Sequence, residues 1–143
     1  MAVLDTTSAG SALTATDDPI GHPVEPVGIE NAEHYRWAQV CDGWHLLKRD
    51  DFSVIRERVP PGASETRHRH ARARQFFYVL DGTAVIEIEG VRHPLATGQG
   101  LHVPPGAPHQ VRNESAADVH FLVVSVPKSY GDRENLEEAG ASP

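Results

Sequence analysis

The sequence predicts an all-β protein, and three observations support this fold class. Candidate strands recur at short intervals, turn signals such as Pro60-Pro61-Gly62 and Asp81-Gly82 separate them, and no long helical pattern interrupts them. This combination is typical of a β-sandwich or a small barrel. The 143 residues suffice for one domain with a sizeable core.

The first half of the chain begins with a stretch that has no apolar periodicity. Residues 1–30 are rich in Ala, Thr, Ser, Asp, Pro and Gly, so we expect a flexible N-terminal arm. Residues 31–40 suit either a short helical turn or an edge strand. Strands are then expected at Trp44–Lys48 and Phe52–Val59, joined by a turn at 49–51. The Pro60-Pro61-Gly62 sequence ends the second strand.

The second half continues the series of strands. Expected strands, in order, are Gln75–Leu80, Thr83–Glu89, Val91–Leu95, Leu101–Val103 and Val119–Val126. Asp81-Gly82 is a strong two-residue hairpin signal. Residues 128–143 form a polar, acidic tail, in which Asp132–Glu138 is either a short helix or a solvated end. These features divide the chain into an arm at 1–30, a barrel at 31–127 and a tail at 128–143.

Three histidines have the spacing of a metal site. His68 and His70 are two residues apart, so a β-strand would place both imidazoles on one face. A third histidine, His109, follows the Pro104-Pro105-Gly106 turn. Isolated histidines are usually satisfied core or surface residues, but this grouping favours a metal site.

The two histidine segments resemble the two motifs of the cupin superfamily. The first motif is matched by Gly62, His68, His70 and Gly82, and the second by Gly98, Pro104, Gly106, His109 and Asn113. The resemblance implies a double-stranded β-helix, in which two antiparallel sheets form a jelly-roll-like barrel. It also implies one divalent metal in the mouth of the barrel, with His68, His70, Gln75 and His109 as candidate ligands.

Gln75 stands where the family usually has a glutamate. An amide is neutral, yet its oxygen can coordinate a metal and its NH₂ group can orient a metal-bound water. Losing the carboxylate leaves more positive charge on the metal, which favours Lewis-acid chemistry, and it removes an obvious general base. The alternative is that Gln75 lies behind the ligands and does not coordinate.

Two further histidines, His102 and His120, lie in expected strands. If either points inward, it would serve as a fourth ligand, an acid–base group or a substrate contact. The catalytic candidates are therefore Gln75, His102 and His120. Imidazole suits zinc, iron, nickel, manganese and copper, so the ligands alone do not identify the metal; zinc is the one we expect.

The composition argues against several classes of partner. Thirteen Lys and Arg against 20 Asp and Glu give a net charge of −7, which disfavours nucleic acid and anionic membranes as partners. Cys41 is the only cysteine, which fits a reducing compartment. The N-terminus lacks the pattern of a signal peptide, and we expect a cytoplasmic protein.

These features predict a metal-dependent enzyme with a small-molecule substrate. Neutral ligands and an apolar lining favour a cyclase or isomerase that acts on a carbonyl-bearing, aromatic or hydrophobic compound. The zinc-containing cupin cyclases of aromatic polyketide pathways are the most similar model. The alternatives are a quercetinase-like dioxygenase and a binding or sensor cupin without turnover. The resemblance further implies a homodimer, to which residues 31–48 would contribute.

Overall fold

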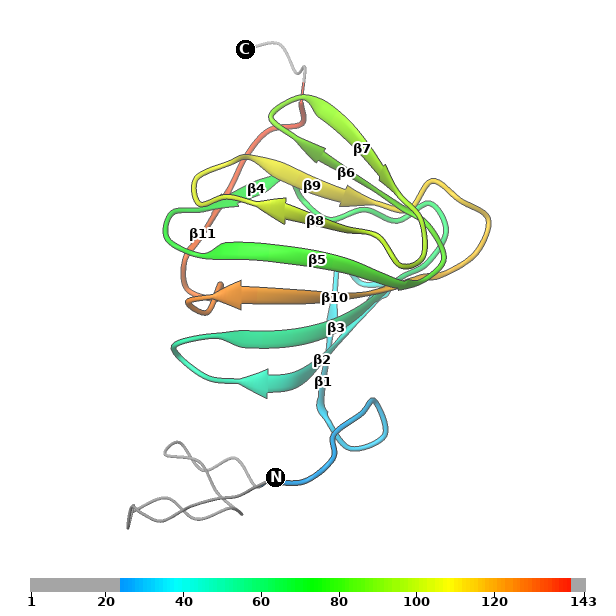
Figure 1. Ribbon diagram of the computed structural model, residues 1–143. Helices are drawn as coiled ribbons and strands as arrows, with labels where there is room; N and C mark the ends of the chain where they lie inside the picture. The colour runs from blue at the N-terminus through cyan, green and yellow to red at the C-terminus, as the bar shows by residue number, and fades with distance from the viewer. Residues whose placement is uncertain (1–23, 140–143) are drawn as a thin grey trace, which may run out of the picture.

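The computed structural model describes residues 24–139, which form two antiparallel sheets facing each other (Figure 1). The six-stranded sheet has the order β1 (Glu33–Trp37), β2 (Cys41–Lys48), β3 (Ser53–Val59), β10 (Val119–Val126), β5 (Arg74–Asp81) and β8 (Gly100–Val103). The five-stranded sheet has the order β11 (Arg133–Asn135), β4 (His68–His70), β9 (His109–Arg112), β6 (Ala84–Ile88) and β7 (Val91–Leu95). The predicted all-β cupin architecture is confirmed. No helix long and apolar enough to cross a membrane occurs within residues 24–139.

Most strands lie where the sequence predicts them, one ambiguous segment is resolved, and the predicted hairpin at Asp81-Gly82 is wrong. Within residues 31–40, the chain forms the edge strand β1, which pairs with β2. The Asp81-Gly82 turn does not make a hairpin, because β5 belongs to one sheet and β6 to the other. Gly82 has φ +91°, and a Cβ there would lie 2.5 Å from the Asp118 carbonyl oxygen. Only glycine therefore fits this crossing between the sheets.

The barrel interior changes from apolar to polar along its length. At one end, Val59 on β3, Val119 on β10 and Val79 on β5 are buried with Phe121 and Ile86 in the main core. Towards the other end, the inward row across the same strands consists of Ser53, Ser125 and Gln75. The apolar end supplies the burial that holds the sheets together, which leaves the polar end available for a site.

The C-terminal segment differs from the expected solvated tail. Residues Arg133–Asn135 form β11, which pairs antiparallel with β4, the strand that carries His68 and His70. The Asp132 carboxylate also accepts hydrogen bonds from the backbone N–H groups of Arg72 and Ala73 at 2.9 and 2.8 Å. Figure 1 shows this segment passing from the six-stranded sheet to the five-stranded one. The proposed boundary at residue 127 therefore does not separate an independent tail. Most of the expected arm lies outside the described residues.

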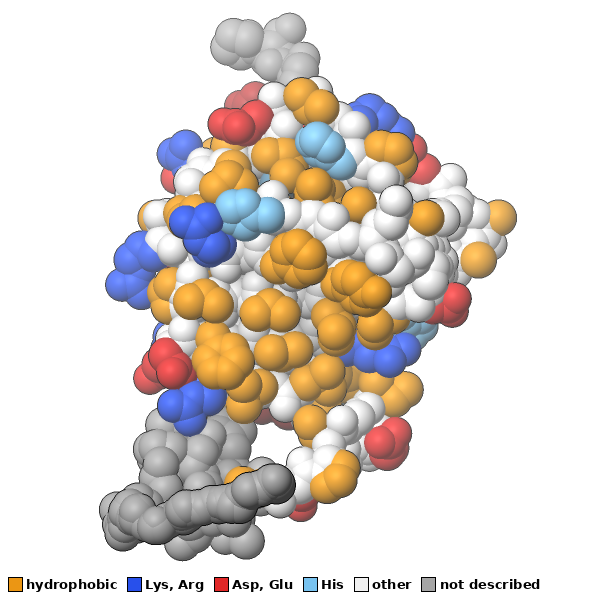
Figure 2. All heavy atoms as spheres, viewed as in Figure 1, with side chains coloured by type: hydrophobic (Ala, Val, Ile, Leu, Met, Phe, Trp, Pro, Cys, Tyr) orange, Lys and Arg blue, Asp and Glu red, His pale blue; other side chains and the backbone are white. Residues whose placement is uncertain are grey.

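The outer face of the six-stranded sheet carries exposed apolar side chains. Figure 2 shows them gathered over the sheet face turned to the viewer. Phe76 and Tyr78 on β5 are 45% and 40% exposed, and Val126 at the end of β10 is 50% exposed. These side chains point away from the barrel interior, so they do not contribute to the histidine site.

Candidate metal centre

Three histidines meet at the polar end of the barrel. β4 supplies His68 and His70, and β9 supplies His109, which is the cross-strand partner of His68. Their candidate ligand atoms all lie within 4.8 Å of one another, and all three residues are buried. The expected His-x-His geometry is therefore present, because alternation along β4 turns both imidazoles to the same side.

Two of the three histidines are held in a form that suits metal binding. The Nδ1–H groups of His68 and His109 donate to the carbonyl oxygens of Thr66 and Ala107 at 2.8 and 2.9 Å. Those bonds fix the tautomer and leave Nε2 with its lone pair. Within residues 24–139, the buried Nε2 atom of His109 has no hydrogen-bond partner. This unpartnered atom is what a metal ligand requires.

Burial also keeps the imidazoles neutral. It lowers the pKa of His68 to about 3 and the pKa of His109 to about 4, and it lowers the pKa of His70 as well. The positive charge of Arg133 lowers all three pKa values further. Neutral imidazole is the ligand form, so the residues present fit a divalent transition metal.

Gln75 lies on the inward face of β5 and is buried. Its Nε2 donates a 3.0 Å hydrogen bond to Ser125 Oγ. Its Oε1 is buried and, among the described residues, accepts no hydrogen bond. Because Ser125 occupies the amide nitrogen, the oxygen is the free end of the side chain, and an oxygen is the end that coordinates metals.

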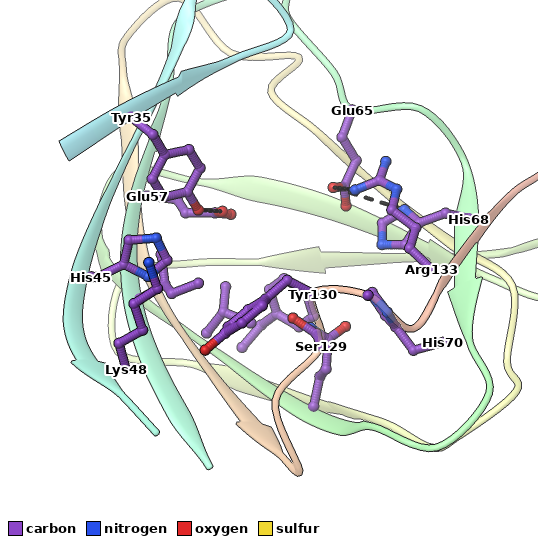
Figure 3. Close-up of a pocket in the computed structure, with 15 residues that line it drawn as sticks. Tyr35, His45, Lys48, Glu57, Glu65, His68, His70, Ser129, Tyr130 and Arg133 are labelled. Atoms are coloured by element: carbon purple, nitrogen blue, oxygen red, sulfur yellow. Dashed lines mark hydrogen bonds and ion pairs between the residues drawn. The ribbon is translucent and has the colours of Figure 1, made fainter. Parts of the chain in front are cut away.

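A cavity of about 510 Å³ opens beside the histidines (Figure 3). Its lining combines polar, aromatic and aliphatic side chains from both sheets: Tyr35, His45, Lys48, Ile55, Glu57, Glu65, His68, His70, Gln75, Phe77, Val123, Ser129, Tyr130, Gly131 and Arg133. Gln75 is thus brought into the same cavity as His68 and His70. His109 is not part of the lining; it lies behind, with its ring centroid 4.3 Å from that of His68.

Two carboxyl groups in the cavity were not identified from the sequence. Glu57 on β3 accepts a 3.1 Å hydrogen bond from the Tyr35 hydroxyl, and burial raises its pKa to about 7. Glu65, in the segment before β4, has its pKa raised to about 8, mainly by burial and then by the charge of Glu57. The available signal for Glu57 was its place on the same strand face as Ile55 and Val59, where a charged residue is unusual.

The C-terminal segment contributes the opposite charge. Arg133 on β11 places Nη1 3.9 Å from Glu65 Oε2 and donates from Nη2 to the Thr66 carbonyl oxygen at 3.3 Å. Tyr130 lines the same cavity and lies under the ammonium group of Lys128, 5.0 Å from its ring centroid. Nothing in the polar sequence of this segment indicated that it would cover the barrel.

The other two candidate histidines lie away from the cavity, which corrects their placement. His102 on β8 is exposed and opposite Phe76, and its Nε2 is 2.7 Å from Arg74 Nη1. His120 alternates with the buried residues of β10 and points outward, with Nδ1 3.2 Å from Arg56 Nη2. Strand alternation places both side chains on the outer face of the six-stranded sheet.

Comparisons with known proteins agree with this geometry. The family model described as a cupin domain matches residues 55–125. The oxalate-binding protein of Thermotoga maritima is 30% identical over 87 residues, covering 57% of this chain and 72% of that protein. Polyketide synthase CurC of Streptomyces cyaneus is 34% identical over 71 residues, covering 48% of this chain and 46% of that protein, so the match spans less than half of its length.

A solved structure shares the architecture. The TT1209 protein from Thermus thermophilus superposes with a TM-score of 0.64 at 27% identity, covering 73% of this chain and 98% of that one. The matched segment of the family model contains the histidine strands β4 and β9 together with most of the six-stranded sheet. The motifs, the two sheets and the family model agree, and the chain belongs to the cupin family.

Proposed function

We propose that this protein is a metal-dependent enzyme that acts on a carbonyl-bearing, aromatic or hydrophobic small molecule, in the manner of a cyclase or isomerase. The observation that carries the proposal is the donor set: three neutral histidines and a neutral amide oxygen, with no carboxylate among them. A divalent metal held by His68, His70, His109 and Gln75 would keep its full positive charge, because none of these ligands is negatively charged. Such a metal supplies Lewis-acid polarisation of a substrate oxygen.

Zinc is the metal that this chemistry favours, because polarising a carbonyl requires no change of oxidation state. Zinc accepts nitrogen and oxygen ligands in a site that keeps a position for substrate. The protein's own residues bind and orient the substrate. Ile55, Phe77 and Val123 give the cavity an apolar wall that excludes water from the reacting carbon.

The cavity also supports the substrate class. About 510 Å³ accommodates a compound of one or two rings. Aromatic faces at Tyr35, Phe77 and Tyr130 suit a planar substrate. The similarity to a protein named polyketide synthase CurC supports a polyketide-type substrate rather than a sugar. We further propose a cytoplasmic setting, since the one cysteine, Cys41, is buried and unpaired.

The test uses a simple aromatic ketone, ortho-hydroxyacetophenone, as a probe. Polarising its carbonyl acidifies the neighbouring methyl group, so zinc-loaded protein in D₂O is expected to exchange the methyl protons faster than buffer does. Proton NMR measures this exchange. Protein stripped by a chelator and the His70→Ala variant should lose it, whereas His102→Ala, which removes a histidine on the outer face, should keep it. Absence of zinc-dependent exchange in the wild type contradicts the proposal.

A second candidate is a binding protein for a small carboxylate, supported by the relative named oxalate-binding protein and by Arg133 in the cavity. Calorimetric titration of zinc-loaded protein with oxalate separates the two candidates. Oxalate binding without exchange of the ketone probe supports the binding protein. Oxygen uptake by iron-loaded protein with an aromatic diol would instead support the dioxygenase alternative.

A further inference from the structure

We propose that Glu57, held in place by Tyr35, is the acid–base group of this cavity, and that it takes a proton from the carbon next to the substrate carbonyl and later returns it. The inference rests on the proposed function and deepens it. Gln75 has no carboxylate to act as a base, and the geometry assigns that task to a strand on the opposite side of the cavity.

The arrangement of Tyr35 and Glu57 is built into the six-stranded sheet. Tyr35 on β1, Gly43 on β2 and Glu57 on β3 form one row across three neighbouring strands. A side chain at position 43 would overlap the Tyr35 ring. Glycine there lets the tyrosine extend over β2, and its hydroxyl donates to Glu57 Oε2 at 3.1 Å.

Both residues face the substrate space. Tyr35 and Glu57 line the cavity together with His68, His70 and Gln75. Figure 3 shows Tyr35 and Glu57 on one side of the cavity and His68 and His70 on the other. A planar ketone lying between them would have its oxygen towards the histidines and its neighbouring carbon towards Glu57.

The environment of Glu57 is consistent with a base that works near neutral pH. Burial raises its pKa to about 7, while the hydrogen bond from Tyr35 and the charge of Arg133 lower it. Glu65 is the other acidic group that lines the cavity, and the charge of Glu57 raises the pKa of Glu65. Burial and Glu57 also raise the pKa of Tyr35, so the phenol stays protonated and remains a hydrogen-bond donor.

The step balances without a co-reactant. The C–H bond next to the carbonyl breaks, its electron pair moves into the carbonyl to give an enolate, and the proton goes to a Glu57 carboxylate oxygen. In a substrate whose enolate is conjugated with a carbon–carbon double bond, return of that proton to the far end of the conjugated system gives isomerisation. Attack of the enolate carbon on a second carbonyl of the same substrate gives cyclisation, with Glu57 protonating the new alkoxide. Tyr35 acts as a positioning residue throughout.

The experiment compares Glu57→Gln with wild type in the exchange assay. Glu57→Gln is expected to slow zinc-dependent exchange by about 100-fold or more, which is the usual contribution of a general base, and to leave zinc affinity unchanged. Tyr35→Phe is expected to slow exchange by roughly tenfold. It should also move the low-pH limb of the pH–rate profile to higher pH, because the hydrogen bond that lowers the pKa of Glu57 is lost. Glu89→Gln, an exposed carboxylate in the turn between β6 and β7, is the matched control.

A second readout does not require turnover. Carbon-13 NMR of the glutamate carboxyl groups in metal-free protein, assigned with Glu57→Gln, is expected to give a midpoint near 7 for Glu57 and a higher one in Tyr35→Phe. Exchange at the wild-type rate in Glu57→Gln would overturn this inference and leave the proposed function standing. Exchange that requires Glu57 but not zinc would contradict the proposed zinc-dependent function and leave the role of Glu57 as a base standing. Loss of exchange together with loss of zinc binding in Glu57→Gln would make Glu57 part of the metal centre and would also overturn the inference.

Discussion

Replacing Glu57 with glutamine should stabilise the metal-free protein at alkaline pH. Glutamine has nearly the same shape, and its carbonyl oxygen can still accept the hydrogen bond from Tyr35. What the substitution removes is a carboxylate that is costly to ionise inside the barrel. A residue retained for function commonly lowers stability in this way.

The magnitude follows from the pKa. Burial raises the pKa of Glu57 from 4.5 to about 7, and each pKa unit corresponds to about 1.4 kcal/mol. Ionised Glu57 therefore costs the fold about 3 kcal/mol above pH 7. Between pH 4.5 and 7 the folded state binds more protons than the unfolded state, so this cost appears as pH rises and is absent in acid. Removing the Glu57 charge also eases ionisation of Glu65, which increases the gain at alkaline pH.

The assay is urea unfolding with a metal chelator present, followed by tryptophan fluorescence at about pH 4.5 and pH 8.5. Glu57→Gln is expected to unfold at the wild-type free energy at the lower pH and to gain about 3 kcal/mol at the higher pH. The control Glu89→Gln, at an exposed turn position, should change stability by less than about 0.5 kcal/mol at both pH values. A Glu57→Gln protein that is no more stable than wild type at pH 8.5 would refute the reasoning.

Three further predictions concern other parts of the molecule. Gln75→Glu should tighten zinc binding by roughly tenfold, about 1.4 kcal/mol. It should also slow exchange of the ketone probe, because a negatively charged ligand weakens the polarisation of the carbonyl by the metal. Zinc titration and exchange measurements on the same protein check both effects, and faster exchange would favour the dioxygenase alternative. Gly82→Ala should lower the free energy of unfolding by more than about 1 kcal/mol, since Gly82 has φ +91° and a Cβ there would lie too close to the Asp118 carbonyl oxygen. Urea unfolding measures this, and an unchanged urea midpoint would contradict it. We also propose a homodimer to which residues 31–48 contribute, supported by the edge strand β1 and by Val40, which is 48% exposed; a monomer mass at all concentrations in light scattering would exclude it.

The motif residues could be placed from the sequence because their spacing encodes their geometry. The two-residue spacing of His68 and His70 requires one strand face, and the turn before His109 starts the strand that pairs with it. The position of Gln75 followed from the family pattern. Its free oxygen and its bond to Ser125 did not, because they depend on how β5 pairs with β10.

The remaining features depend on contacts between segments far apart in the chain. The outward direction of His120 was available from the alternation of Val119, Phe121 and Val123, whereas that of His102 requires the register of β8 against β5. The row from Tyr35 to Glu57 requires the register of three strands. β11 is three exposed residues with no apolar pattern, and it belongs to the site through its backbone pairing with β4 and the contacts of Arg133 with Glu65 and Thr66.

The central claim is that His68, His70 and His109 bind one divalent metal, and elemental mass spectrometry tests it most directly. Protein purified without added metal is compared with a variant in which all three histidines are alanine, with circular dichroism confirming that both are folded. We expect about one zinc per wild-type chain and none in the variant. Equal metal in both proteins would contradict the assignment, and iron, nickel, copper or manganese in place of zinc would contradict the proposed Lewis-acid zinc site.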